Sequence, residues 1–169
     1  MLESVAATTP HPLVIRPAEP DDADAVEALH GRCSDETLYR RFHSAVPRVP
    51  VGVVHQMLQP VGGWSVLVVS QDTVVGFACA APVSASEVEV GMLVDDRHQR
   101  RGIGTRLLHE LSAGAAERGY QGMECHTLPD NTAVLATLRR AGMIGRVAWR
   151  DGLLQISIPV RRLPPSDLQ

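Results

Sequence analysis

A short loop of the sequence carries the residue types that bind phosphate. Two glycines, Gly102 and Gly104, let the backbone approach an anion without a Cβ in the way. Arg100 and Arg101 add positive charge, and Thr105 adds a hydroxyl that can donate a hydrogen bond. The loop follows an alternating apolar run and precedes a helical one, so backbone N–H groups and the helix dipole would point at the same anion. The sequence therefore predicts a phosphate-binding loop here.

Two common phosphate-binding patterns do not match this loop. A dinucleotide-binding fold needs a third glycine three residues after Gly104, where this sequence has Leu107. A P-loop would lead into Gly-Lys-Ser or Gly-Lys-Thr, and neither glycine does so. The arginines can also be interpreted as a solvated turn or as a small nucleic-acid patch. A net charge of −3 disfavours nucleic-acid binding, which usually shows a basic excess.

Two carboxylates lie on the strand expected just before the loop. In the run from 86 to 94, Glu87 and Glu89 alternate with Val88 and Val90. Because successive side chains of a strand point to opposite faces, the two glutamates share one face. Without the neighbouring loop they would be interpreted as surface charges of an edge strand.

Hydrophobic periodicity and cap residues predict the elements that position these groups. Alternating apolar runs indicate strands, and apolar residues three or four positions apart indicate helices. Strands are expected at 13–16, 64–69, 73–81, 86–94, 122–127, 147–149 and 153–158, and helices at 20–30, 34–42, 105–119 and 131–142, with a loop from 47 to 63. The fold class is therefore α/β, in the order β-α-α-β-β-β-α-β-α-β-β.

Composition and the chain ends indicate one cytoplasmic domain. A chain of 169 residues, 44% hydrophobic and 21% charged, can bury the core of a single domain. We expect flexible ends at 1–12 and 161–169 around a domain at 13–160. The N-terminus lacks the apolar segment of a secretory signal, and the most apolar stretch, Val74–Val83, is too short to span a membrane. The three cysteines lack zinc or disulfide spacing, so no metal is expected.

The segment Gln99–Gly104 resembles the Q/R-x-x-G-x-G/A loop of the GNAT N-acetyltransferases, which bind the pyrophosphate of acetyl-CoA there. The element order agrees with that family, and Asn131–Met143 is similar to its N-x(n)-Gly-Phe segment. Over roughly residues 13–158, the resemblance implies a GNAT fold with a mixed, mostly antiparallel, twisted sheet of about seven strands and about four helices. Within the family, Ser34–Phe42 and Leu128–Asn131 look like the GNAT domain of bacterial protein lysine acetyltransferases.

The resemblance implies acetyl-CoA as co-substrate and assigns roles to single residues. Transfer to an amine needs a base, because a lysine amine with a pKa near ~10.4 is almost wholly protonated at neutral pH. Glu89 is expected to be that base, with Glu87 as its partner or substitute. The strand from 92 to 94 is expected to be splayed by a bulge and to pair with the pantetheine arm. The residues expected to bind the cofactor are Met92, Leu93, Val94, Gln99, Arg100, Arg101, Gly102, Ile103, Gly104, Thr105 and Asn131.

Two features leave part of the chemistry open. Many family members have a tyrosine that protonates the leaving thiolate, and the matching position here is Leu138. His126 and Tyr120 are candidate substitutes. Asp35 and Glu36 would face a cationic lysine acceptor at the substrate entrance, although carboxylates at a helix N-terminus are also explained by the helix dipole.

Three functions are compatible with this sequence. The first is acetylation of a protein lysine, the second is acetylation of a small-molecule amine, and the third is an acyl-CoA-binding module without turnover. Glu89 favours an enzyme, whereas Leu138 favours the module. No nucleic-acid or membrane partner is expected, and the sequence is compatible with both a monomer and a homodimer.

Overall fold

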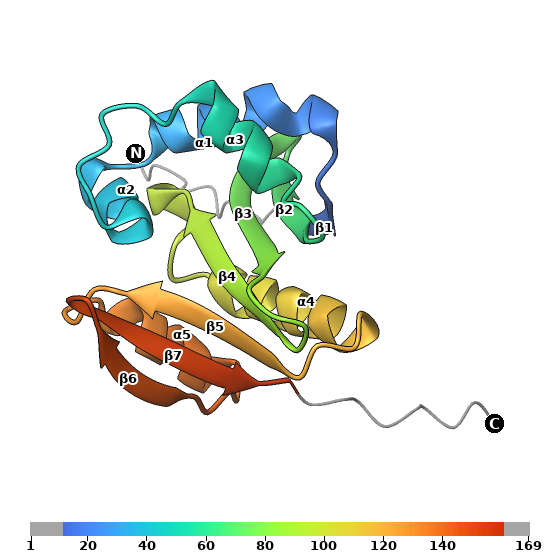
Figure 1. Cartoon of the computed structure of the whole chain (residues 1–169). Helices are drawn as coiled ribbons and strands as arrows, with labels where there is room; N and C mark the ends of the chain where they lie inside the picture. The colour runs from blue at the N-terminus through green and yellow to red at the C-terminus, as the bar shows by residue number, and fades with distance from the viewer. Residues whose placement is uncertain (1–11, 161–169) are drawn as a thin grey trace, which may run out of the picture.

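In the computed structural model, residues 12–160 are described, and they form one seven-stranded sheet with helices on both faces (Figure 1). The strands are β1 (Leu13–Pro17), β2 (Trp64–Ser70), β3 (Thr73–Pro82), β4 (Glu87–Val94), β5 (Gly122–Thr127), β6 (Arg146–Arg150) and β7 (Leu153–Pro159). Their order in the sheet is β1-β2-β3-β4-β5-β7-β6, and only β4 and β5 are parallel neighbours. The predicted α/β class and the mixed, mostly antiparallel sheet are confirmed.

Within residues 12–160, five α-helices, one more than the four ranges predicted from the sequence, cover the two faces of the sheet (Figure 1). The first face carries α1 (Ala23–Arg32), α2 (Asp35–Phe42) and α3 (Val51–Leu58), and the other carries α4 (Ile103–Glu117) and α5 (Thr132–Arg140). Short 3-10 turns, η1 (Pro20–Asp22) and η2 (Asp96–His98), lie before α1 and before the glycine loop. None of the helices in the described part of the chain is long and apolar enough to cross a membrane.

Helix α3 lies in the segment that the sequence predicts to be a loop. Its first half, Val51–Val54, contains Gly52 and β-branched residues, which are weak helix formers. Packing outweighs that preference, because Val54 and Leu58 lie four residues apart on one face and are buried in the core shared with α1. Its N-cap residue, Pro50, makes no side-chain capping hydrogen bond, so α3 lacks the start signal that Ser34 gives to α2.

Strands β4 and β5 diverge after a short parallel pairing, and this opening positions the site. The pairing runs from Glu87 with Gly122 to Glu89 with Glu124, and β4 then continues without β5 as far as Val94 (Figure 1). The bulge predicted in β4 is not seen in its pairing with β3, which keeps one register along the described strand. The splay therefore comes from the divergence of two strands.

Candidate active site

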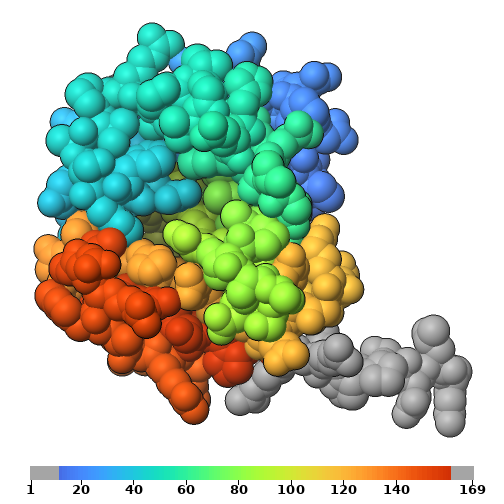
Figure 2. Space-filling view, viewed as in Figure 1, coloured from blue at the N-terminus to red at the C-terminus, as the bar shows by residue number. Residues whose placement is uncertain are grey.

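A cleft of about 610 Å³ opens where β4 and β5 diverge. Its walls come from α2, β4, β5, α5 and the loop between β4 and α4. Figure 2 shows this hollow between the cyan α2 region, the yellow-green β4 and the orange C-terminal strands. The predicted site residues that line it are Glu36, Glu89, Met92, Leu93, Val94, Gln99, Arg100, Gly102, Ile103, Gly104, Thr105 and Asn131. Three others of the described chain, Asp35, Glu87 and Arg101, are not on its walls.

The N-terminus of α4 has the geometry of an anion site. Arg100 (φ 61°) and Gly102 (φ 79°) both have left-handed backbone conformations that turn the chain into the helix. Gly102 is the N-cap and offers no side chain to the first-turn N–H groups, which leaves them for a ligand. A Cβ at Gly102 would meet no atom within 4 Å, so the conformation rather than crowding favours glycine. These donors and the helix dipole suit a pyrophosphate.

The next two residues fix the loop to the rest of the protein. The Ile103 side chain is only 1% exposed and packs in the core beneath the sheet. A Cβ at Gly104 would lie 3.2 Å from Cγ2 of Thr137, so glycine at this position lets α4 approach α5 closely. The structure therefore gives Gly104 a packing role that the loop motif does not predict.

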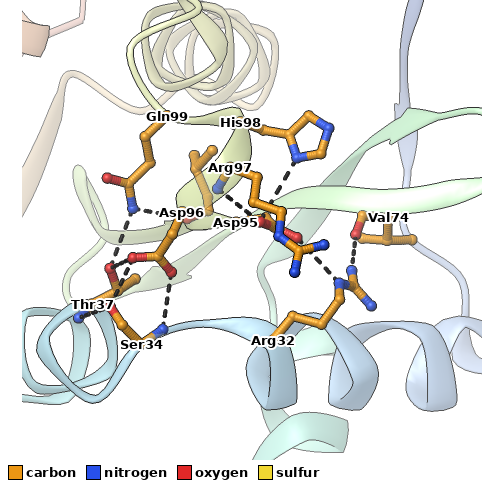
Figure 3. Close-up of polar contacts among 10 residues, drawn as sticks. Arg32, Ser34, Thr37, Val74, Asp95, Asp96, Arg97, His98 and Gln99 are labelled. Atoms are coloured by element: carbon orange, nitrogen blue, oxygen red, sulfur yellow. Dashed lines mark hydrogen bonds and ion pairs between the residues drawn. The ribbon is translucent and has the colours of Figure 1, made fainter.

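Asp96 ties this loop to the start of α2 (Figure 3). Its carboxylate accepts hydrogen bonds from Ser34 N (2.9 Å), Ser34 Oγ (2.7 Å) and Thr37 Oγ1 (2.8 Å). Burial alone would raise the pKa of Asp96, but these hydrogen bonds hold it below its usual value. The Gln99 amide donates to Thr37 Oγ1 (3.2 Å) and to Val94 O (3.1 Å). The amide of Gln99 thus holds the loop to α2 and β4. That Gln99 contacts the cofactor remains a prediction.

Asp95 ties the same loop to α1 and β3 (Figure 3). Its side chain is 4% exposed and accepts from Arg97 N (3.0 Å) and Arg32 Nε (3.1 Å). Arg32 also donates to Val74 O at 2.6 Å. Burial opposes ionisation, yet the Arg97 N–H and the Arg32 guanidinium keep the pKa of Asp95 below its usual value. Sequence reasoning missed both aspartates, because their partners lie far away along the chain.

Glu89 is the predicted base and lies at the point where β4 leaves β5. Its side chain is 51% exposed, and Oε1 is 3.5 Å from Nδ1 of His126. Its register partner on β5 is Glu124, which accepts a hydrogen bond from Gln155 Nε2 at 2.6 Å. Glu87 is exposed on the same strand but lies outside the cleft. The structure therefore brings His126, rather than Glu87, to the carboxylate of Glu89.

Glu89, Glu124 and His126 lie close enough together to hold a metal ion. One ligand atom each from Glu89, Glu124 and His126 lies within 4.8 Å of the other two. The sequence predicts no metal because its cysteines lack zinc spacing, and it is the pairing of β4 with β5 that brings these three residues together. A carboxylate and imidazole set of this kind suits a divalent transition metal.

Leu138, at the position where the resemblance leads us to expect a proton donor, has an apolar side chain. Leu138 is 4% exposed and lines the cleft with carbon atoms alone. Tyr120, a candidate substitute donor, instead stacks on Trp64 with ring centroids 6.2 Å apart, and it is not among the described residues that line the cleft. His126 does line it. Of the two candidate substitutes, only His126 is brought to the site.

Asn131 and Glu36 are both linked to Arg40 on the cleft wall. Asn131 is the N-cap residue of α5, but its side chain makes no capping hydrogen bond. Its Oδ1 accepts from Arg40 Nη1 at 3.3 Å instead. Arg40 also donates to Glu36 Oε1 at 2.6 Å, so the charge of Glu36 is paired within α2.

Known proteins share this fold. A model of the acetyltransferase (GNAT) family matches residues 30–143. The GNAT domain of S. lividans PAT is 27% identical, with 86% of this chain and 89% of that chain covered and a TM-score of 0.78. A phosphinothricin acetyltransferase from Sinorhizobium meliloti, in complex with AcCoA, is 17% identical, with 88% of each chain covered and a TM-score of 0.70. The ribosomal-protein-alanine N-acetyltransferase from Brucella melitensis is 24% identical, with 86% and 98% covered and a TM-score of 0.67.

Proposed function

The chain belongs to the GNAT family of acetyltransferases, and on that premise we propose that its acceptor is a protein lysine and that Glu89 is its general base. The activity class is that of an acetyl-CoA-dependent N-acetyltransferase. The position of Glu89 carries the proposal. It lies where β4 leaves β5, on the wall of the cleft that also contains the N-terminus of α4.

The cofactor has a place in this cleft that matches its chemistry. Its pyrophosphate would lie at the N-terminus of α4, where free N–H groups and Arg100 face the cleft. Its pantetheine arm carries amide groups, and β4 beyond Glu89 has no β5 partner for the main-chain groups on that edge. Residues 92–94 would therefore pair with the arm as an added strand does.

The acetyl group then moves in one step from sulfur to nitrogen. The amine must first lose a proton, because its usual pKa is near ~10.4, and the Glu89 carboxylate takes it. The neutral nitrogen attacks the thioester carbonyl, so that a C–N bond forms, the C–S bond breaks, and the nitrogen releases its second proton to water as the amide forms. The thiolate leaves with the electron pair of that bond. A thiol is acidic enough, near ~8.5 for the cysteine analogue, to leave without a donor at Leu138.

The lysine acceptor is supported by similarity. Residues 34–42 and 128–131 resemble the GNAT domain of bacterial protein lysine acetyltransferases, and the GNAT domain of S. lividans PAT is 27% identical to this chain. The α2 segment, which contains the residues Asp35 and Glu36 predicted at the entrance, belongs to the stretch that resembles such enzymes. The other acceptor class, a small-molecule amine, is an outcome of the experiment below.

Replacement of Glu89 tests the proposed base. We expect Glu89→Gln to lower kcat for acetylation of a lysine peptide by roughly 10²-fold to 10⁴-fold, because the amine then loses its proton acceptor. The KM for acetyl-CoA should stay within about twofold, since a carboxylate and an amide have the same shape. Free thiol released from acetyl-CoA is the measurement. Glu87→Gln is the matched control, because Glu87 lies on the same strand outside the cleft.

Each result decides one part of the proposal. Full turnover by Glu89→Gln would exclude it as the base. If Glu87→Gln lost as much turnover as Glu89→Gln, the loss would come from removing a negative charge from the strand and not from removing a base. Thiol release with small amines but with no lysine peptide would leave the enzyme class intact and replace the acceptor.

A further inference from the structure

Arg41, in the last turn of α2, lies against β4 on the wall of the cleft. Its guanidinium occupies the space where position 91 would otherwise have a side chain. A Cβ at Gly91 would lie 2.6 Å from Nη2 of Arg41 and 2.7 Å from Cζ. A side chain at position 91 would have to displace the guanidinium, so glycine here lets the cation lie against the strand.

The guanidinium has weak partners for a partly buried cation. Nη2 contacts two sulfur atoms, Met57 Sδ at 3.6 Å and Cys79 Sγ at 3.8 Å. The Phe42 ring centroid is 5.1 Å from Cζ, and the buried Nε has no hydrogen-bond partner among residues 12–160. Within the same residues, no carboxylate lies within salt-bridge distance of Arg41. Four other arginines do have such a partner: Arg16, Arg32, Arg40 and Arg48.

The partners of the guanidinium leave most of its hydrogen-bonding capacity unused within the described residues. Sulfur is a weak hydrogen-bond acceptor, and burying a charge without an opposite charge or full hydrogen bonding is unfavourable. A planar guanidinium offers a fork of donors that matches a carboxylate with two hydrogen bonds. The cation therefore has the chemistry of a carboxylate subsite.

The subsite lies next to the proposed base. Glu89 and Gly91 are on the same face of β4, two residues and about 7 Å apart along the strand. His43, at the end of α2, lies near both groups: burial lowers its pKa, the charge of Arg41 lowers it further, and Glu89 acts in the opposite direction. A molecule whose amine reaches Glu89 would thus place its neighbouring group at Arg41.

We infer that Arg41 binds a carboxylate that the acceptor carries close to its reacting amine. The inference rests on the proposed function, because it takes the amine to react at Glu89. The cofactor phosphates are not the ligand in question, since their predicted site is the N-terminus of α4. The carboxylate has two sources with the same chemistry. It can be the free carboxyl group of a lysine, or an acidic side chain beside the lysine in a protein.

Two matched pairs of acceptors test this inference and separate the sources. The first pair is Nα-acetyl-lysine and its C-terminal amide. The second pair is a lysine peptide with Asp and Glu neighbours and the same peptide with Asn and Gln. We expect the wild-type protein to prefer the carboxylate member of at least one pair by roughly tenfold to a hundredfold in kcat/KM, the range expected for hydrogen bonds to a charged group.

The variant Arg41→Gln should remove this preference. We expect its KM to rise for the carboxylate member alone, while kcat for the amide member and the KM for acetyl-CoA stay near the wild-type values. Arg41→Lys, which keeps the charge but loses the fork, should give an intermediate preference. Arg150→Gln, on the exposed strand β6, is the control and should keep the wild-type preference. The thermal midpoint of each variant shows whether it is folded.

Three outcomes would overturn the inference. The wild-type protein could show no preference within either pair. Arg41→Gln could lower kcat equally on both members, as expected of a residue that polarises the thioester. Arg41→Gln could also keep the full preference. If no acceptor releases thiol, the proposed function fails, and calorimetric binding of Nα-acetyl-lysine and its amide to the CoA-bound protein still decides the role of Arg41.

Discussion

At the scale of residues, the guanidinium of Arg41 lies where a side chain at position 91 would be. A motif search does not detect this contact, because the two residues are far apart in the sequence. A Cβ at position 91 would lie within 2.7 Å of two guanidinium atoms, so a methyl group there must displace the arginine. We expect Gly91→Ala to lower the free energy of unfolding by about 1 kcal/mol or less, the low end of the cost of overpacking, because the atoms displaced are the far end of a flexible side chain. In an Arg41→Gln background the cost should be smaller, because the shorter side chain leaves room.

Urea denaturation of the four proteins of this double-mutant cycle measures the coupling between the two positions. Gly102→Ala is the matched control, since a Cβ at Gly102 meets no atom within 4 Å and its cost comes from the left-handed backbone alone. That cost should be the same with and without Arg41. An equal cost of Gly91→Ala in both backgrounds would show that the two side chains do not compete for this space.

Cys125 lies on the cleft wall and raises the question of a covalent acetyl-enzyme. Burial raises its pKa to about 11, and the charges of Glu89 and Glu124 act in the same direction. The thiolate needed for attack is therefore scarce at neutral pH. We expect Cys125→Ser to keep kcat within about threefold, and intact-protein mass spectrometry with acetyl-CoA alone to show no added acetyl group. A stoichiometric acetyl adduct that disappears in Cys125→Ser would favour transfer in two steps.

At the scale of elements, the loop between β4 and α4, where we propose that the cofactor phosphates bind, is held to α1 and α2 by hydrogen bonds of Asp95 and Asp96. Asp96 uses both carboxylate oxygens to hold the start of α2. In Asp96→Asn, one oxygen is replaced by an NH₂ group that faces another donor. We expect the KM for acetyl-CoA to rise by about tenfold or less, with a smaller change in kcat and a loss of about 1 kcal/mol in stability.

Steady-state kinetics at varied acetyl-CoA measures this effect. Thr37→Val removes a single donor to Asp96 and should give a smaller rise of the same kind. An unchanged KM in Asp96→Asn would show that the loop keeps its conformation without the anchor. A fall in kcat alone would place the effect of Asp96 on the reaction rather than on cofactor binding.

At the scale of the whole molecule, a buried histidine makes stability depend on pH. His30 is 3% exposed between the helical layer and the sheet, its Nδ1 donates to Val26 O at 2.7 Å, and its buried Nε2 has no partner in the described chain. Burial lowers its pKa below the usual value of 6.5. As pH falls below about 6.5, His30 binds a proton in the unfolded chain but stays neutral in the folded protein, so the free energy of unfolding falls.

The aspartates act in a lower pH window. The pKa values of Asp95 and Asp96 are depressed in the folded state, so their contribution is complete above the unfolded value near ~3.9 and is lost as pH falls through the folded value. We expect the thermal midpoint to fall in two stages between pH 8 and pH 3. His30→Leu should weaken the first stage, while His43, whose pKa is also lowered, keeps part of it. An unchanged first stage in His30→Leu would assign it to other groups.

The local chemistry of the sequence determined a large part of this protein. Alternation along β4 places Glu87 and Glu89 on one exposed face, and the Asp151-Gly152 pair forms the left-handed turn that joins β6 and β7. The glycine loop predicts the anion site at the start of α4. These features depend on residues within a few positions of one another, where backbone preferences and periodicity act directly.

The tertiary structure decided the features that need contacts between distant segments. The anchors of Asp95 and Asp96 join the loop to α1 and α2, and helix α3 forms because Val54 and Leu58 are buried. The divergence of β4 from β5 opens the cleft, brings His126 to Glu89 and leaves Glu87 outside. Packing against residues from distant parts of the chain sets these positions. The residue spacing within a single segment therefore could not predict them.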